Sequence, residues 1–287
     1  MELSVAEDQH GQRLDTFTAQ AMPRLSRAFV QKLCAQGDVL VNNKPGRPGQ
    51  KLHTGDIVRV VYDQSELDST PDIDLPVLYE DPDCIVVDKP AGVLTHTQSS
   101  FNTEATVASF LRHRAAGLSG ERAGIVHRLD RATSGVMIGA KNPATLSFLQ
   151  KQFAQRKVKK LYIAVVQGQL KQDEAVIDMP IERNPKAPAT FRVGAGGKPA
   201  RTHYRAVQAN KRYSLLELRP ETGRTHQLRV HLAKLGHPIV GDSLYGSGTF
   251  GDRLYLHATS LELTLPGGVR KTFTAPLPPE FRAIMEE

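Results

Sequence analysis

The segment HRLDRATSGVMIGAK, residues 127–141, places one carboxylate between two arginines and then runs into an apolar stretch. The run from Gly135 to Ala140 predicts a β-strand, so Asp130 is expected in a loop just before that strand. Cations beside a carboxylate favour its charged form. A charged, partly desolvated carboxylate can attack a sugar carbon or stabilise positive charge that develops on it. A salt-bridged surface loop fits the same residues, and this segment alone leaves both interpretations open.

A second segment, ETGRTHQLRVHL, starts at Glu221 and predicts a loop followed by a helix from about His226 to Leu235. Gly223 permits an unusual backbone angle in that loop, and Thr225 is a suitable cap for the helix. Arg224 would then project from the start of the helix. A guanidinium there can pair with a carboxylate or a phosphate through two parallel hydrogen bonds.

The third segment is KLYIAVVQG, residues 160–168, which predicts a strand from Leu161 to Val166. Tyr162 and Ala164 share one face of this strand, because side chains alternate along it. A tyrosine on a strand can stack on a nucleic-acid base and offer its hydroxyl for proton transfer. A tyrosine of the core or of a sheet edge is the alternative for Tyr162.

Motifs for other chemistry are incomplete in this sequence. His226 and His231 are five positions apart, so they do not share a helix face as two zinc ligands would, and we expect surface or packing roles for them. The stretch GAGGKP at 194–199 is expected to form a turn. A phosphate-binding P-loop would need Gly in place of Arg192 and Ser or Thr in place of Pro199. No glycine-rich loop stands in the strand–helix context that dinucleotide binding requires.

The cysteine content and the absence of long apolar runs indicate the compartment. Cys34 and Cys84 are the two cysteines, which excludes a disulfide framework and a four-cysteine zinc site. A reducing compartment is the simplest interpretation. Residues 1–15 lack the basic and apolar regions of a signal peptide, and no apolar run is long enough to cross a bilayer. We therefore expect a cytoplasmic monomer without membrane association.

Charge varies along the chain and indicates its domain organisation. Lys and Arg number 37 against 30 Asp and Glu, a formal net charge of +7, which favours a polyanionic partner but also fits a merely basic protein. Residues 63–83 hold eight acidic residues, three prolines and no Lys or Arg. We interpret this stretch as a solvated acidic linker. It would join a first domain at 11–62 to a second domain at 84–287.

The first domain is predicted to be two short helices followed by strands. Leu14, Phe17 and Ala21 fall on one face of the first helix, which ends before Pro23. The second helix would begin at Ser26 as cap and close at Gly37. Strands are expected at Val39–Val41 and Ile57–Val60.

The second domain is predicted to be mostly strands with a few helices. Asn142 and Pro143 predict the start of a helix that carries Leu146, Leu149 and Phe153 on one face. Strands and helices do not alternate regularly, which favours an α+β fold with a mixed or antiparallel sheet. Besides the strands already named, the expected strands are Ile85–Val87, Ala175–Ile177, Thr202–Val207, Ser214–Leu218, Leu254–Leu256 and Leu261–Leu265.

Taken together and in this order, the three segments resemble the RluA family of pseudouridine synthases. HRLDRATSGVMIGAK is similar to the family's catalytic loop, RPETGRTHQLRVHLAKLGHPIVGDSLYG to its longest signature, and KLYIAVVQG and DKPAGVLTH to two further strands. The resemblance covers roughly residues 78–285. Residues 11–61 resemble the small RNA-binding module of ribosomal protein S4, through RLDTF, LSRAFVQKL, GDVLVNNK and LHTGDIVRV.

The resemblance implies an isomerase that converts uridine in RNA to pseudouridine without a metal or an organic cofactor. It implies that Asp130 is the catalytic aspartate, that Tyr162 lies against the target base and that Arg224 pairs with Asp130. Arg128 would enter the RNA helix and fill the space left by the flipped base. Leu256 is the expected apolar residue of the substrate pocket. Basic residues expected to bind RNA in the first domain are Arg24, Arg27, Lys32 and Lys44.

The chemistry requires that uracil leave C1′ of its ribose, turn, and rejoin through C5 without water intervening. The nucleotide must therefore be flipped into a closed site, at a cost of a few kcal/mol that phosphate contacts can offset. The aspartate can form a sugar adduct or assist elimination to a glycal, and both routes stay open. Large-subunit ribosomal RNA is the expected substrate. Transfer RNA, or a non-catalytic role in RNA binding or ribosome assembly, is the alternative.

Overall fold

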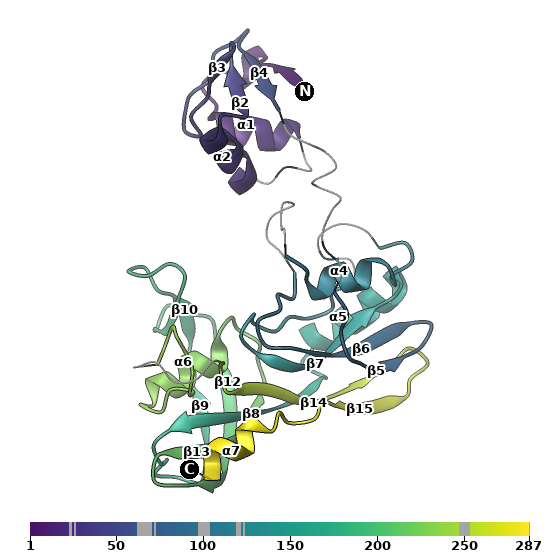
Figure 1. Cartoon of the computed structure of the whole chain (residues 1–287), viewed down its shortest axis with the longest axis vertical. Helices are drawn as coiled ribbons and strands as arrows, with labels where there is room; N and C mark the ends of the chain where they lie inside the picture. Colours follow the sequence, from purple (N-terminus) through teal and green to yellow (C-terminus); the bar gives the residue numbers. More distant parts are fainter. Residues whose placement is uncertain are drawn as a thin grey trace.

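The computed structural model describes residues 1–22, 25, 27–61, 71, 73–96, 104–118, 122, 124–246 and 253–286. Within these ranges, no helix is long and apolar enough to cross a membrane. The strands form a four-stranded sheet, a nine-stranded sheet and a separate two-stranded hairpin. The four-stranded sheet is built from the first 60 residues and exchanges no strand with the large sheet (Figure 1).

The N-terminal unit is a small antiparallel sheet with two helices. Its elements are β1 (Glu2–Ser4), a 3-10 turn (Glu7–Gln9), α1 (Leu14–Ala21), α2 (Arg27–Gln36), β2 (Val39–Val41), β3 (Lys44–Pro45) and β4 (Ile57–Val60). The strands lie in the order β1-β4-β2-β3. Asn42 and Asn43 join β2 to β3 with positive φ angles of 50° and 64°, as a two-residue hairpin turn requires.

Apolar side chains of the two helices bury one core against this sheet. Leu14 and Phe17 from α1 and Val30 from α2 pack in one cluster with the inward residues of β2 and β4. Ala21, expected on the same face, is exposed at the last position of α1, beyond the buried residues of that helix. Pro23 and Ser26, the expected helix stop and cap, lie outside the described residues.

The large sheet confirms the α+β prediction. Its strand order is β5-β6-β7-β14-β8-β13-β12-β9, with β15 beside β14, and every pairing is antiparallel except that of β7 with β14. The strands are β5 (Val77–Glu80), β6 (Cys84–Lys89), β7 (Ser134–Ala140), β8 (Lys159–Gln167), β9 (Glu174–Asp178), β12 (Arg201–Ala209), β13 (Tyr213–Pro220), β14 (Leu256–Thr264) and β15 (Arg270–Thr274). The separate hairpin is β10 (Ile181–Arg183) and β11 (Phe191–Val193), and the helices are α4 (Val107–Arg112), α5 (Pro143–Ala154), α6 (Gln227–Lys234) and α7 (Glu280–Glu286).

Two expectations for this part of the chain were wrong in their boundaries. The acidic segment does not remain a linker as far as residue 83, because Leu75 is buried and Val77–Glu80 forms β5 at the sheet edge. The strands expected at Leu254–Leu256 and Leu261–Leu265 are one strand, β14. The polar residues in the middle of β14 are accommodated by a register shift against β8 between Ala258 and Ser260. The strand therefore continues without a turn.

Two separate apolar cores meet at the loop that precedes β7. One core packs α4 and α5 on β6, β7 and β14, and it includes Leu129 of the loop. The other packs α6 on β8, β12 and β13, and Ala132 of the loop contacts it. Gly135 opens β7 with a φ of +118°, and a Cβ there would lie 2.2 Å from the carbonyl oxygen of Ala258. Only glycine allows this approach of β7 to β14, which fixes the loop at the junction of the cores.

Candidate active site

A cavity of about 440 Å³ lies where the loop before β7 faces β8 and the start of α6. It is lined by all five residues of the second domain that were predicted from the sequence to belong to the site: Arg128, Asp130, Tyr162, Arg224 and Leu256. Residues up to 128 positions apart in the chain, such as Arg128 and Leu256, therefore line one space.

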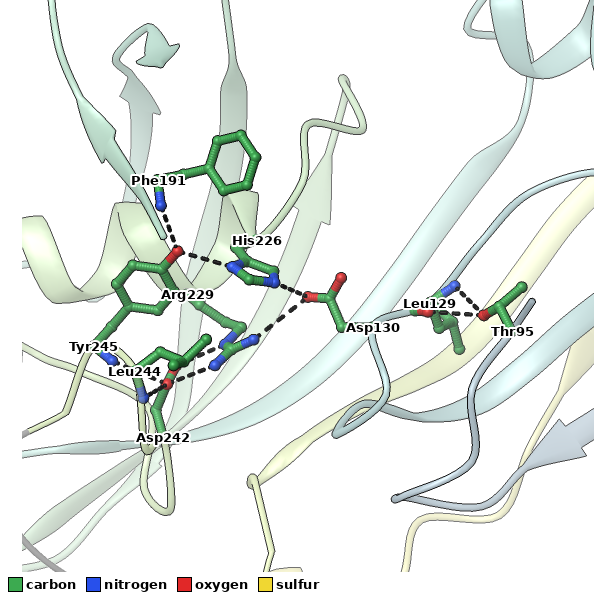
Figure 2. Close-up of polar contacts among 9 residues, drawn as sticks. All are labelled: Thr95, Leu129, Asp130, Phe191, His226, Arg229, Asp242, Leu244 and Tyr245. Atoms are coloured by element: carbon green, nitrogen blue, oxygen red, sulfur yellow. Dashed lines mark hydrogen bonds and ion pairs between the residues drawn. The ribbon is translucent and has the colours of Figure 1, made fainter. Parts of the chain in front are cut away.

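The carboxylate of Asp130 lines this cavity, and Figure 2 shows its two polar contacts, with Arg229 and His226. Its Oδ2 atom lies 3.7 Å from Nη1 of Arg229 and 3.9 Å from Nε2 of His226. Both distances exceed those of a hydrogen bond, and among the described residues the carboxylate accepts none. The Asp130 side chain is 19% exposed. It is thus held near positive charge while its lone pairs remain available.

The backbone around Asp130 is fixed from the neighbouring segment. The Thr95 hydroxyl donates to the Leu129 carbonyl at 2.8 Å and accepts from the Leu129 N–H at 3.2 Å (Figure 2). The buried ammonium of Lys89 donates to the carbonyl of Arg131 at 3.3 Å. Residues on both sides of Asp130 are therefore anchored, which limits the positions that its carboxylate can take.

Arg229 is the guanidinium that faces Asp130, and a second aspartate holds it. Its Nε and Nη2 atoms donate to Asp242 at 2.8 and 2.7 Å, and both side chains are almost fully buried. Burial alone would raise the pKa of Asp242, but the hydrogen bonds and charge of Arg229 outweigh it and hold that pKa below its ordinary value. The N–H groups of Leu244 and Tyr245 also donate to Asp242. This bidentate pair leaves Nη1 as the atom of Arg229 directed at Asp130.

The expected pairing of Arg224 with Asp130 is wrong. Nε of Arg224 donates to the Pro199 carbonyl at 3.0 Å, and the ion pair of Asp130 is with Arg229 instead. Arg224 lies in the loop before α6, as expected, but this loop directs its guanidinium to Pro199, whereas the first turn of α6 directs Arg229 at Asp130. The sequence does carry a signal for Arg229. It stands between apolar residues of the predicted helix, which indicates that it is buried, and a buried cation needs a partner.

The start of α6 also differs from expectation. Thr225 is not the cap, since the cap residue is His226, which makes no capping hydrogen bond through its side chain. Gly223 does not adopt a positive φ; His226 does, at +56°. Residues other than glycine adopt the left-handed conformation in only a few per cent of cases, with Asn, Asp and His the most frequent, and such residues cluster at functional sites.

His226 reaches the cavity and is oriented by Tyr245. The Phe191 N–H donates to the Tyr245 hydroxyl oxygen at 2.8 Å, and that hydroxyl lies 2.8 Å from Nδ1 of His226 (Figure 2). This contact holds the imidazole so that Nε2 is the ring atom facing Asp130. Burial lowers the pKa of His226. The Tyr245 ring also lies under the guanidinium of Arg229, 5.1 Å away.

Tyr162 and Leu256 form the apolar wall of the cavity. Tyr162 packs against both cores of the second domain, and burial followed by the negative charge of Asp130 raises its pKa above the ordinary value. Its hydroxyl therefore stays protonated at neutral pH and can act as a hydrogen-bond or proton donor. Leu256 is buried at the start of β14. Arg128 is exposed at the rim, where it can reach a bound nucleic acid.

The basic residues nominated in the N-terminal unit have different environments. Lys32 and Lys44 are exposed. Arg27 donates through Nε to the buried carboxylate of Asp15 at 3.0 Å while half of its side chain remains exposed. Arg24 lies outside the described residues. In the described part of the chain, no three His, Cys, Asp or Glu side chains are grouped as a metal site.

Comparison with known proteins agrees with this geometry. A family model for RNA pseudouridylate synthases matches residues 83–234, and one for the S4 domain matches residues 12–58. The chain is 39% identical to ribosomal large subunit pseudouridine synthase D of Nitrosomonas europaea, over 100% of this chain and 87% of that protein. It is 33% identical to synthase C of Vibrio parahaemolyticus, over 92% and 88%.

Solved structures show the same relation. Human RNA pseudouridylate synthase domain containing 1 is 31% identical, with a TM-score of 0.60, over 73% of this chain and 87% of that one. Human RNA pseudouridylate synthase domain containing 4 is 26% identical, with a TM-score of 0.59, over 72% of this chain and 90% of that one. The chain belongs to the RluA family of RNA pseudouridine synthases and carries an S4 domain ahead of its synthase domain.

Proposed function

We propose that this enzyme converts specific uridines of large-subunit ribosomal RNA to pseudouridine, with Asp130 as the catalytic carboxylate. The observation that carries the proposal is the carboxylate of Asp130, which lies in a cavity beside Arg229 and Tyr162 and accepts no hydrogen bond from the described residues. The relatives that match over the whole chain are named for ribosomal large-subunit RNA, which supports that substrate. The S4 domain supplies a second RNA-binding surface, and tethering two surfaces raises affinity. We place the enzyme in the cytoplasm as a monomer.

The reaction breaks the bond between N1 and C1′ of the target uridine and forms a bond between C5 and C1′. The proton on C5 is lost and N1 gains one, so no other reactant is consumed. Asp130 uses an oxygen lone pair either to bond to C1′ or to assist removal of a ribose proton on the way to a glycal. Because its oxygens accept no hydrogen bond from the described residues, neither route requires one of these bonds to be broken first.

The other cavity residues act on orientation and on water. Arg229 places positive charge 3.7 Å from the carboxylate, and His226 directs its Nε2 atom toward it. Tyr162 presents its ring to the base and a protonated hydroxyl to the detached uracil. Leu256 and the Tyr162 ring limit the room for water that would hydrolyse the glycosidic bond. Arg128, exposed at the rim, takes the space that the flipped nucleotide leaves in the RNA.

Tritium release from uracil C5 tests this proposal, because each isomerisation frees the C5 hydrogen. Unmodified large-subunit ribosomal RNA and transfer RNA, both labelled at C5, are offered to the wild type, to Asp130→Asn and to Asp178→Asn. Asp178 is an exposed carboxylate outside the cavity and serves as the matched control. We expect release from ribosomal RNA by the wild type and by Asp178→Asn but not by Asp130→Asn. Release from transfer RNA alone would contradict the substrate, and full activity of Asp130→Asn would contradict the site.

A further inference from the structure

A second cavity, of about 760 Å³, shares part of its wall with the Asp130 cavity, and five of its thirteen lining residues are Lys or Arg. The two cavities share Arg156, Val158, Lys160, Pro220 and Glu221. We call this second cavity the basic groove. Its Lys and Arg residues are Arg156, Lys159, Lys160, Arg205 and Arg219.

The groove keeps a positive balance after its acidic residues are counted. Glu174 and Glu221 line it, and Glu217 lies beside it on β13. Glu262 also lies beside the groove, 3.3 Å from Lys159, so five Lys and Arg side chains against four carboxylates leave a net charge of +1, without His203. Grooves of positive charge that lead away from a nucleotide pocket are the usual way in which proteins follow a nucleic-acid backbone.

Two arginines in the groove are held side by side by one carboxylate. Arg205 on β12 is the cross-strand partner of Glu217 on β13, and Arg219 is two residues further along β13, on the same face. Nη2 of Arg205 and Nη2 of Arg219 lie 3.1 and 2.6 Å from the same oxygen, Oε2 of Glu217. Both arginines are half exposed, whereas Glu217 is largely covered.

This arrangement suits a phosphate. A guanidinium carries five N–H donors in a fixed fork, and the contact with Glu217 involves one terminal nitrogen of each arginine. The carboxylate of Glu217 offsets one of the two arginine charges. The two guanidinium groups can therefore lie close together and still attract an anion. The pair is therefore organised before any ligand arrives, which reduces the ordering cost of binding.

Arg156 lies at the junction of the two cavities and is exposed where it lines both of them. Its φ of +57° belongs to the cap that ends α5, in which the N–H of Arg156 donates to the Phe153 carbonyl and the N–H of Lys157 donates to the Gln152 carbonyl. The end of a helix therefore holds this guanidinium at the entrance to the Asp130 cavity.

We propose that the basic groove binds the phosphodiester backbone of the substrate RNA next to the extruded uridine. Arg205 and Arg219 clamp one phosphate, and Arg156 contacts the backbone at the entrance to the Asp130 cavity. This inference rests on the proposed function, since it takes the occupant of the Asp130 cavity to be a nucleotide of an RNA chain. Contacts of this type fix the register of the RNA on the enzyme without reading its sequence.

The test compares Arg205→Ala/Arg219→Ala with a control of equal charge, Lys211→Ala/Arg282→Ala, whose two residues are exposed outside the groove. The probe is unmodified large-subunit ribosomal RNA transcribed in vitro, with the Kd measured over a range of salt concentrations. We expect the groove variant to raise the Kd roughly tenfold at low salt and to lower the slope of log Kd against log salt by about 1. The control should change neither by more than about twofold.

Turnover separates a binding role from a structural one. At saturating RNA the groove variant should keep its kcat, with the loss confined to KM, because neither arginine lines the Asp130 cavity. Arg205→Lys/Arg219→Lys should restore the salt slope but only part of the affinity, since lysine lacks the fork. An unchanged Kd and slope in the groove variant, with the wild type active, would overturn the inference. A wild type inactive on every RNA would instead overturn the proposed function, and the binding data would still decide the groove.

Discussion

Each of the two domains contains an aspartate beside arginine side chains. The two carboxylates differ in the hydrogen bonds that they accept, and this difference explains which of them can react. Asp15 in the S4 domain is fully buried and accepts hydrogen bonds from Arg13, Arg27 and Gln31 at 2.7 to 3.0 Å. Asp130 in the synthase domain lies 3.7 Å from its arginine and accepts no hydrogen bond from the described residues. The first carboxylate is saturated by the protein, and the second is left open to a ligand.

Asp15 and Asp130 differ in this way because their neighbouring arginines have different other partners. Arg13 and Arg27 direct their donors at Asp15 itself. Arg229 gives its Nε and Nη2 atoms to Asp242 in a buried bidentate pair, so its Nη1 atom alone faces Asp130, at 3.7 Å. A second carboxylate therefore provides the geometry that keeps the first one unbonded. Charge around an aspartate is not sufficient to identify a reactive site; unused lone pairs beside a cavity are also required.

Arg229→Ala should give the largest effect, because it removes the partner of both Asp130 and Asp242. Leaving buried Asp242 unpaired should cost about 3–5 kcal/mol of stability, and loss of the group facing Asp130 should lower kcat by about 10³-fold. Unfolding in urea and single-turnover tritium release measure the two losses. Arg224→Ala is the control, since Arg224 contacts only the Pro199 carbonyl through its guanidinium in the described structure. Equal losses in the two variants would contradict the assignment of Arg229.

Acid should destabilise the synthase domain before the S4 domain. Burial lowers the pKa of His127 to about 3 and that of His257 to about 4, whereas in the unfolded chain both would bind protons below pH 6.5. The unfolded state then binds more protons, so stability falls as pH falls, by about 1.4 kcal/mol per pH unit for each histidine. Between pH 6.5 and 5 the loss should be about 4 kcal/mol.

The S4 domain should resist this range of pH. Hydrogen bonds from Arg13 lower the pKa of Asp15, so the stability that this carboxylate contributes is lost only below the unfolded value near 3.8. Methyl NMR of both domains during urea unfolding at pH 7 and pH 5 measures the two stabilities separately. Equal acid sensitivity of the two domains, or a synthase domain whose stability is constant from pH 7 to 5, would contradict the buried neutral histidines.

Asp15→Asn should reduce stability without reducing turnover. The substitution keeps the size of the side chain but removes the charge that Arg13 and Arg27 contact, at a cost of about 2–3 kcal/mol in the S4 domain. The kcat on RNA should remain that of the wild type, because Asp15 does not line the Asp130 cavity and its hydrogen bonds lie within the S4 domain. Asp8→Asn, at an exposed position of the same domain, should change neither. A large loss of kcat in Asp15→Asn would remove the distinction between the two aspartates.

Tyr245→Phe should give the smallest effect. It removes the hydroxyl that orients His226 but keeps the ring under Arg229. Loss of one such hydrogen bond is worth about 1 kcal/mol, or roughly fivefold in kcat. Tyr213→Phe, in a core away from the cavity, is the matched control. If kcat and its pH profile were the same in Tyr245→Phe and the wild type, His226 would have no positioning role.

Sequence patterns predicted the long elements and the main residues of the site, but not the contacts that make the site work. The strands now called β6, β7, β8 and β13, and the cap of α5 by Asn142, follow from local periodicity and capping chemistry. The short strands β1, β3, β10 and β11 have two or three residues each, too few for a periodic signal.

Local sequence patterns could not predict the side chains that hold the site residues in place, for a physical reason. Asp242 and Tyr245 are 13 and 19 residues from the side chains that they hold, and only the folded chain selects them. The sequence offered Arg224 alone as the partner of Asp130, because the pairing of Arg229 with Asp242 depends on contacts that only the folded chain makes. The left-handed conformation of His226 had no local signal, because tertiary contacts impose it.

The most direct test of the central claim compares the two aspartates on either side of Arg229. Asp130→Asn and Asp242→Asn are each measured for thermal unfolding and for single-turnover tritium release from large-subunit ribosomal RNA. The open carboxylate should be needed for chemistry alone, so Asp130→Asn should lose more than about 10³-fold in rate and stay within about 1 kcal/mol of wild-type stability. Asp242→Asn should lose about 3 kcal/mol of stability. An Asp130→Asn protein that is strongly destabilised yet still turns over RNA would contradict the account.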